Sequence, residues 1–392
     1  MKHRLIWDTL KKEIDSDEII VITGPRQVGK TTTINWLLEN IPSTNKIYFD
    51  MQNIAEREVF ETKNANSIIN ELQRRGINTS QRIYIAIDEI QLLDTLPGII
   101  KYLYDHYKIK FFLTGSSSYY IKNRFSESMA GRKLIYEMYP LRFQEFLDFK
   151  GINYKLPDLL GDTVQFDNNA YNLLSTLYEE YIEYGGLPKV VLVNDFEKKR
   201  QLLEEIFSSY ITLDVETLAD FRSSADFRKV IKLIATRIGN RTNIAELCKI
   251  IGISRPTVMA YIDFLEKTYL IRTVEAISNS EDVRVRKPPK IYFVDTGIAN
   301  LNADLSGGCK FENTVGHQLS FYGVLNYFES RDGEIDFIIN RQLAVEVKET
   351  PTDSHLTKLH TRSGSLGIRN SLIVGREKSA KFEKYLWGGC IK

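Results

Sequence analysis

The chain has 392 residues, of which 43% are hydrophobic and 26% are charged, and its formal net charge is +1. This composition is typical of soluble globular proteins and excludes a wholly disordered chain and a collagen-like fibre. The near-zero charge provides no overall attraction to nucleic acid, so any basic surface must be local. A chain of this length is expected to form two or three domains.

Neither a membrane segment nor a disulfide framework is expected. No apolar run approaches the ~18 residues that span a bilayer, and residues 1–8 lack the apolar core of a signal peptide. We therefore expect a cytoplasmic protein with no membrane partner. Cys248, Cys309 and Cys390 are isolated from one another, which predicts reduced, structural thiols and no zinc site.

Apolar strands and helices alternate over residues 1–150. Strands that are apolar throughout and separated by helices predict a parallel sheet with both faces covered. The predicted strands are 19–23, 47–49, 82–87, 109–114 and, as a fifth, 133–139; the predicted helices are 30–39 and 64–75.

The rest of the chain has a different pattern. Residues 150–170 predict a linker, residues 171–235 are helical throughout, and 237–277 form a compact unit of short helices. Two prolines at 288 and 289 mark a boundary. After it we expect a strand at 291–294, a helix at 311–326 and a strand-rich segment to 349.

A phosphate-binding loop is predicted between the first strand and the first helix. Residues 24–31 fit the pattern G-x-x-x-x-G-K-[ST] in the strand–loop–helix context that the motif requires. Gly24 and Gly29 allow the backbone amides to turn inward and cradle phosphates. We expect Lys30 to reach the β- and γ-phosphates and Thr31 to bind Mg²⁺. The nucleotide-contacting candidates are Gly24, Pro25, Arg26, Gln27, Val28, Gly29, Lys30, Thr31 and Thr32.

Polar side chains at the ends of later strands complete this prediction. Asp88 and Glu89 follow an apolar strand, and a carboxylate there faces the ligand crevice of a parallel sheet. We expect Asp88 to hold Mg²⁺ and Glu89 to orient and deprotonate water; the alternative is an acidic helix cap. Thr114 or Ser116 either senses the γ-phosphate or simply ends a strand. Arg132 either stabilises transition-state charge, in cis or across a subunit interface, or is solvated.

These motifs resemble those of the AAA-type P-loop ATPases of bacteria and archaea. Together with 140–146 (PLRFQEF) and 184–188 (YGGLP), they resemble more narrowly a prokaryotic family that joins this ATPase to a long C-terminal domain of poorly defined function. The resemblance covers nearly the whole chain. It implies that ATP is the nucleotide and that Gly186 and Pro188, in a helical lid, lie by the base. From the residues alone, Gly186 and Pro188 indicate only a helix break.

Residues 242–271 resemble a winged helix-turn-helix. Gly252 makes the turn, Ser254 is a credible N-cap, and Pro256 suits a first helical turn. Ser254, Arg255, Thr257 and Tyr261 are candidate DNA contacts, with Arg284, Arg286 and Lys287 reaching phosphates. The same helix also carries the acidic residues Asp263 and Glu266 and is not strongly basic. Domain packing or protein binding is therefore as well supported as DNA contact, because a fold alone does not fix a function.

Residues near the C-terminus form a second candidate site. Glu346 and Lys348 share one face of a predicted strand, and Asp336 lies on the preceding strand. Glu312 is expected to begin a helix upstream. This order resembles the restriction-endonuclease-like core, in which carboxylates and a lysine bind Mg²⁺ and activate water. The alternative is a cross-strand surface pair of Glu346 and Lys348.

We therefore predict an α/β fold with a P-loop NTPase parallel sheet, a helical lid, a winged helix and an α/β nuclease-like C-terminal domain. The predicted boundaries are 1–150, 165–235, 236–285 and 286–392. The predicted function is Mg²⁺-dependent ATP hydrolysis coupled to duplex DNA. The alternative is an ATP-driven switch with an inactive nuclease-like domain. A homo-oligomer is consistent with Arg132 acting in trans.

Overall fold

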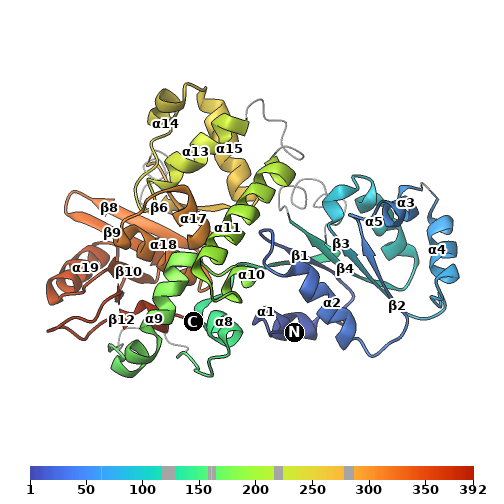
Figure 1. The fold of residues 1–392 in the computed structure, drawn as a ribbon, viewed down its shortest axis with the longest axis horizontal. Coiled ribbons are helices and arrows are strands. Elements are labelled where there is room, and N and C mark those ends of the chain that lie inside the picture. Colours follow the sequence, from blue (N-terminus) through green and yellow to red (C-terminus); the bar gives the residue numbers. More distant parts are fainter. Residues whose placement is uncertain are drawn as a thin grey trace. The chain divides into compact units, whose positions relative to one another are not determined.

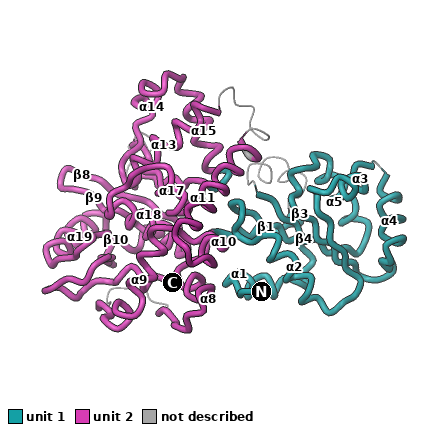
Figure 2. Tube along the Cα trace, viewed as in Figure 1, with its two compact units in different colours: residues 1–139, 267–269 teal, residues 140–266, 270–392 magenta. Residues whose placement is uncertain are grey.

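The computed structural model describes residues 1–62, 64–116, 129, 131–157, 160, 165–215, 224–277 and 287–392. The chain divides into two compact units (Figure 2). Unit 1 comprises Met1–Tyr139 and Lys267–Tyr269, and unit 2 comprises Pro140–Glu266 and Leu270–Lys392. Arg284 and Arg286, two of the predicted phosphate contacts, lie outside the described residues.

Unit 1 contains a five-stranded sheet with strand order β2-β3-β4-β1-β5 (Figure 1). All of its strand pairs are parallel, which confirms the predicted parallel sheet and its fifth strand. The strands are β1 (Ile19–Thr23), β2 (Lys46–Asp50), β3 (Ile83–Asp88), β4 (Ile109–Gly115) and β5 (Lys133–Glu137).

Helices cover both faces of this sheet. Alternate residues such as Ile83, Ile85 and Ile87 pack with α3, α4 and α5 in one buried core, while α2 contacts β3 and β4 and is itself contacted by α1. The central strands β1, β3 and β4 are buried at every position, which explains why they are mainly apolar. The unit 1 helices are α1 (Ile6–Lys12), α2 (Lys30–Asn40), α3 (Ile54–Glu61), α4 (Ala65–Arg74), the 3₁₀ turn η1 (Ile90–Leu92) and α5 (Leu96–His106).

The register brings the carboxyl ends of three strands to one edge. Because β4 lies between β1 and β3, the P-loop after β1, Asp88 at the end of β3 and Thr114 in β4 are neighbours. The fold of unit 1 therefore assembles, at one sheet edge, residues that are far apart in sequence.

Unit 2 contains a mixed seven-stranded sheet with strand order β12-β11-β10-β9-β8-β6-β7. One face packs against α19 through a core that includes Ile335, Ala344 and Leu359, and α18 contacts β7 and β10. The strands are β6 (Ile271–Ala276), β7 (Lys290–Phe293), β8 (Leu325–Ser330), β9 (Gly333–Ile339), β10 (Leu343–Lys348), β11 (Asn370–Gly375) and β12 (Leu386–Trp387).

The helices of unit 2 follow the predicted helical pattern over most of the described residues of 171–235. They are α8 (Phe143–Lys150), α9 (Asn168–Tyr184), α10 (Pro188–Val191), α11 (Phe196–Tyr210), the π-helix η2 (Ile211–Val215), α13 (Ser224–Ala235), α14 (Ile244–Ile251), α15 (Arg255–Lys267), α17 (Thr296–Asn302), α18 (Gly307–Leu319), α19 (Asp353–Ser365) and the 3₁₀ turn η3 (Gly388–Cys390). The prediction that Glu312 begins a helix is wrong: α18 begins at Gly307, where Ser306 caps it by accepting from Cys309 N.

β6, which begins at the end of the segment that resembles a winged helix-turn-helix, belongs to this larger sheet. β6 pairs antiparallel with β7 and parallel with β8, so it extends the sheet that carries Asp336 and Glu346. The boundaries between the predicted lid, winged helix and C-terminal domain stay predictions.

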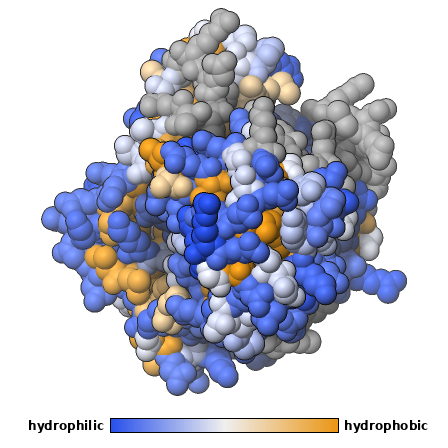
Figure 3. Space-filling view, turned by 90° about the vertical axis from the view of Figure 1, so that its right-hand side faces the viewer, coloured by the Kyte–Doolittle hydropathy of each residue, from blue (hydrophilic) through white to orange (hydrophobic). Residues whose placement is uncertain are grey.

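The surface is mainly polar on the face drawn in Figure 3. Hydrophilic side chains predominate there, and the hydrophobic ones gather in small patches between them (Figure 3). In the described part of the chain, no helix combines the length and the apolar character needed to cross a membrane.

Candidate functional site

The P-loop connects β1 to α2 through unusual backbone angles. Gly24, Gln27 and Gly29 have positive φ values of 146°, 60° and 97°. Gly29 is the N-cap of α2 in the left-handed conformation, and no described side chain caps this helix. The N-terminus of α2 therefore has the arrangement of main-chain amides that binds phosphate.

Lys30 lies inside the loop. Its side chain is 5% exposed, and its Nζ donates to the carbonyl oxygens of Gly24 at 2.9 Å and Pro25 at 2.7 Å. The ammonium group is thus held on the inner side of the loop. Val28 is buried, whereas Gln27, Thr31 and Thr32 are exposed.

Asp88 is the best-connected polar group of the site. Its Oδ2 accepts from the Thr31 hydroxyl at 2.6 Å and from the Tyr48 hydroxyl at 3.1 Å. Its Oδ1 accepts from the Thr114 hydroxyl and from the Glu89 amide, the latter at 3.0 Å. The structure therefore brings together Thr31 and Asp88, the predicted Mg²⁺ residues, and Thr114, a candidate sensor of the γ-phosphate; their roles stay predictions.

Tyr48 is a site residue that the sequence analysis missed. Burial and the neighbouring Asp88 carboxylate raise the pKa of its hydroxyl, which keeps the hydroxyl protonated as a donor to Asp88. Tyr48 belongs to no sequence motif. The pairing of β2 with β3 in the folded chain places it near Asp88.

Glu89 begins a second polar group. Its backbone is left-handed, with φ 53° and ψ 49°, and its Oε2 accepts from Gln91 Nε2. Gln91 Nε2 also lies 2.9 Å from Ser116 Oγ. Ser116 is thus linked to Glu89 through Gln91, another residue that the sequence analysis missed.

Arg4 supports the P-loop from outside the motif. Its guanidinium is buried and donates to Val28 O at 2.6 Å and to Tyr139 O at 2.8 Å. A charged donor to a main-chain carbonyl is stronger than a neutral one, so Arg4 fixes the loop next to Gly29.

Arg132 does not lie at this edge. It precedes Lys133, which pairs with Ile19 at the start of β1, whereas the P-loop follows the end of β1. Its guanidinium forms a bidentate pair with Asp105, at 2.8 and 3.3 Å. This placement contradicts a role in cis; a role across a subunit interface stays a prediction.

Gly186 and Pro188 belong to unit 2, and their expected position by the base stays a prediction. Gly186 N donates to Asp295 Oδ2 at 2.8 Å, and Gly186 O accepts from Leu141 N at 2.7 Å. Burial raises the pKa of the Asp295 carboxyl to about 6. Pro188 is the first residue of α10, which suits its fixed φ.

The C-terminal candidates also meet in the folded chain. Lys348 Nζ lies 2.8 Å from Glu346 Oε1 and 3.7 Å from Asp336 Oδ2. Val347 N donates to the same Asp336 oxygen at 2.7 Å. Glu346 is 6% exposed, and its Oε2 makes no hydrogen bond with any described residue. Burial, together with Asp336, raises the pKa of Glu346 to about 7.

Glu312 lies beside this group with two residues that were not predicted. It accepts from the Tyr292 hydroxyl at 2.7 Å, and its Oε1 is 3.7 Å from Lys290 Nζ. Lys290 also pairs with Glu334. Burial and Asp336 raise the pKa of Glu312 to about 7. We call Lys290, Glu312, Glu334, Asp336, Glu346 and Lys348 the carboxylate–lysine cluster.

Lys348 and Lys290 neutralise the carboxylates of the cluster, so a divalent cation would compete with their ammonium groups for the same oxygens. Within the described ranges, no group of three His, Cys, Asp or Glu side chains converges as a preformed metal site. A metal ion would therefore have to displace the ammonium group of Lys348 or Lys290. The unpartnered Oε2 of Glu346 is the atom that such an ion would satisfy.

Helices α14 and α15 follow one another, with Gly252 at a φ of 81° ending α14; that they form a winged helix-turn-helix stays a prediction. Ser254 Oγ accepts from Thr257 N at 3.3 Å, as expected for an N-cap, and Ser254 and Arg255 are exposed. The prediction that Tyr261 contacts DNA is wrong. Its side chain is buried and packs edge-to-face on Phe227.

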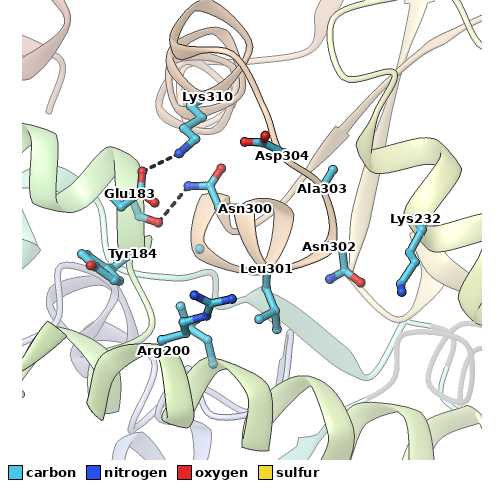
Figure 4. A pocket seen from close by; sticks show the side chains of 12 residues that line it. Glu183, Tyr184, Arg200, Lys232, Asn300, Leu301, Asn302, Ala303, Asp304 and Lys310 are labelled. Carbon is cyan, nitrogen blue, oxygen red and sulfur yellow. Dashed lines mark hydrogen bonds and ion pairs between the residues drawn. The ribbon is translucent and has the colours of Figure 1, made fainter. Parts of the chain in front are cut away.

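Unit 2 also has a pocket of 530 Å³ among α9, α11, α13, α17 and α18 (Figure 4). Lys310 Nζ donates to Glu183 Oε2 at 2.6 Å, and Asn300 Nδ2 donates to Glu183 O at 2.8 Å. Arg200 and Lys232 reach it from two further helices. Charges of both signs meet in this pocket, and it contains none of the predicted site residues.

Comparison with known proteins agrees with the geometry of unit 1. Residues 16–147 match the family model of an AAA domain, and residues 175–307 match that of a domain of unknown function (DUF8612). Residues 16–147, most of unit 1, are therefore similar to an AAA domain.

The whole chain is also similar to several proteins. An uncharacterized protein of Haemophilus influenzae is 26% identical, covering 92% of this chain and 90% of that one. The uncharacterized protein MJ1544 of Methanocaldococcus jannaschii is 25% identical, covering 98% and 87%. Among solved structures, the Walker-type ATPase PABY2304 of Pyrococcus abyssi has a TM-score of 0.48 at 17% identity and covers 77% of this chain and 96% of that one.

Proposed function

We propose that unit 1 hydrolyses ATP with Mg²⁺. The observation that carries this proposal is the 2.6 Å contact between the Thr31 hydroxyl and Asp88 beside the P-loop lysine. A hydroxyl and a carboxylate are the oxygen ligands that Mg²⁺ prefers, so these residues fit the ion. When bound, the ion neutralises charge on the phosphate oxygens.

The protein residues then have separate roles. The amides after Gly29 and the Lys30 ammonium bind the phosphates, and Lys30 must exchange its bonds to the Gly24 and Pro25 carbonyls for bonds to phosphate oxygens. Asp88 holds the Thr31 hydroxyl in place. Glu89 accepts a proton from the attacking water, whose oxygen forms the new bond to the γ-phosphorus as the bond to ADP breaks.

Steady-state turnover tests this proposal directly. Lys30→Ala should abolish both ATP binding and hydrolysis, and Glu89→Gln should reduce kcat by about 100-fold or more while ATP still binds. The matched control is Lys46→Ala, because Lys46 also donates to two carbonyl oxygens, those of Leu38 and Ile41, but lies away from the P-loop. Turnover that survives in Lys30→Ala would refute the proposal.

We further propose that ATP turnover is coupled to duplex DNA through unit 2. Support comes from the helix pair α14–α15 with Ser254 and Arg255 exposed at its turn. ATP hydrolysis should rise on adding duplex DNA, and the rise should shrink at higher salt because phosphate contacts release counterions. Turnover that is indifferent to DNA would favour the alternative, an ATP-driven switch with a protein partner.

The carboxylate–lysine cluster has a candidate function of its own, Mg²⁺-dependent cleavage of a phosphodiester. The specific observation in favour is the buried, unpartnered Oε2 of Glu346 beside Asp336 and Lys348. Glu346→Ala should abolish cleavage and leave ATP turnover intact. If wild-type protein cuts no DNA with Mg²⁺ or Mn²⁺, the cluster is a structural network in which lysines take the place of metal.

A further inference from the structure

Gln91 forms contacts at the ATP site that go beyond those of a packing residue. It lies in η1, two residues after Glu89, and is 6% exposed. Its single amide nitrogen donates both to Glu89 Oε2 and to Ser116 Oγ, the latter at 2.9 Å. One side chain therefore connects the carboxylate after β3 with the hydroxyl after β4.

The carbonyl oxygen of the Gln91 side chain has no hydrogen-bond donor among the described residues. This atom, Oε1, is buried. A buried acceptor without a donor is less stable than the same group in solvent. An apolar side chain of similar size would fill the same space without that loss of stability, so packing alone does not account for a glutamine here.

Glu89 needs support from outside its own backbone. A non-glycine residue at φ 53° and ψ 49° is in the unfavourable left-handed conformation, so neighbouring groups must maintain it. The main chain is held because Glu89 N donates to Asp88 Oδ1 at 3.0 Å and to Thr114 Oγ1 at 3.3 Å. The orientation of the Glu89 carboxylate is held separately, by the hydrogen bond that Gln91 Nε2 donates to Oε2.

We infer that Gln91 is the positioning residue of the water-activating carboxylate. By holding Oε2 of Glu89, it leaves Oε1 to accept the proton of the attacking water, and through Ser116 it fixes this orientation relative to β4. This inference rests on the proposed hydrolysis of ATP by unit 1. It assigns to Ser116 an indirect role through Gln91, in place of a direct contact with the γ-phosphate.

Two substitutions of Gln91 test the effect of its amide donor separately from the effect of its size. Gln91→Glu preserves the size and removes the amide donor, whereas Gln91→Leu removes all polar atoms. Both should lower kcat by about 10- to 100-fold, because a misplaced catalytic group costs that much. The Kd for ATP, measured with Glu89 intact, should change by less than about 2-fold, because neither substitution touches the phosphate-binding loop.

A double-mutant cycle tests whether Gln91 acts through Glu89. If it does, Glu89→Gln combined with Gln91→Leu should be no slower in single-turnover hydrolysis than Glu89→Gln alone. The matched control is Gln144→Leu in α8. Gln144 is equally buried and has three hydrogen bonds, to Asp148 Oδ1 and Tyr154 O and from Leu156 N, but it belongs to unit 2. Its removal should leave kcat unchanged.

Each outcome decides the inference. Wild-type kcat in both Gln91 variants, a parallel loss of ATP affinity, or multiplicative effects in the double variant would overturn it. If Glu89→Gln abolishes turnover while the Gln91 variants hydrolyse ATP normally, only this inference fails. If wild-type protein shows no turnover above that of Lys30→Ala, the proposed function fails together with it.

Discussion

Substituting Gly24 by alanine tests how the P-loop is packed. Gly24 has a φ of +146°, and a Cβ there would lie 1.9 Å from Met138 O and 3.0 Å from Met138 C. The Met138 backbone cannot move away easily, because its amide donates to Thr23 O at 2.7 Å. The first residue of the loop is thus in contact with the main chain that follows β5.

The expected destabilisation combines two effects. A non-glycine residue in this backbone region costs about 1–3 kcal/mol, and forcing apart closely packed groups adds about 1–3 kcal/mol. We therefore expect Gly24→Ala to lower the free energy of unfolding by about 3–5 kcal/mol. Gly76→Ala is the matched control, because Gly76 has a φ of +86° but nothing within 4 Å of the added Cβ. It should cost only about 1–2 kcal/mol.

Urea unfolding followed by tryptophan fluorescence measures both variants. Trp7 and Trp36 stack in unit 1 with ring centroids 4.5 Å apart, and the third tryptophan, Trp387, lies in unit 2. A Trp387→Phe background therefore confines the signal to unit 1. A difference between the two variants below about 1 kcal/mol would refute the packing argument, which requires a contribution from the clash.

Three further predictions follow from contacts of single side chains. Arg4→Met should lower the free energy of unfolding by about 2–3 kcal/mol and raise the KM for ATP, because Val28 O loses a charged donor. Calorimetry measures the first effect and steady-state turnover the second. An unchanged KM would contradict the prediction. Tyr48→Phe should reduce kcat several-fold through the loss of the hydroxyl donor to Asp88, with Tyr84→Phe as the control. For Glu346, burial raises the folded-state pKa to about 7, so its stabilising contribution is present at low pH and is lost as the pH rises through 7. Unfolding at pH 6 and pH 8 should therefore show a drop in stability, on the order of 1 kcal/mol, that Glu346→Gln lacks; an equal drop in both proteins contradicts the assignment.

Much of unit 1 could be predicted from local sequence patterns. Strands buried on both faces have continuous apolar runs, and the P-loop has a spacing set by the backbone angles that Gly24 and Gly29 must adopt. The pairing of Thr31 with Asp88 follows from the rule that parallel strands end at one edge. These features depend on neighbours in sequence or on a general property of parallel sheets.

Arg132 shows where such reasoning fails. The motif context indicated a catalytic arginine, but the register of β5 against β1 places it at the start of the strands, paired with Asp105. Tyr261 is a similar case, because the resemblance to a DNA-binding helix made it a candidate contact, whereas packing against Phe227 buries it.

The sequence by itself determined the parallel α/β sheet of unit 1 and where its G-x-x-x-x-G-K-[ST] loop and Asp88 lie along the chain, because each follows a local pattern of residues. Only the tertiary structure decided which distant side chains complete the site. Arg4 and Tyr48 carry no motif, and they reach the P-loop and Asp88 only because folding brings their elements to this site. Gln91 is near Glu89 in sequence, but only the tertiary structure joins it to Ser116. Hydrogen bonds between residues far apart in sequence depend on register and packing, which no local pattern specifies.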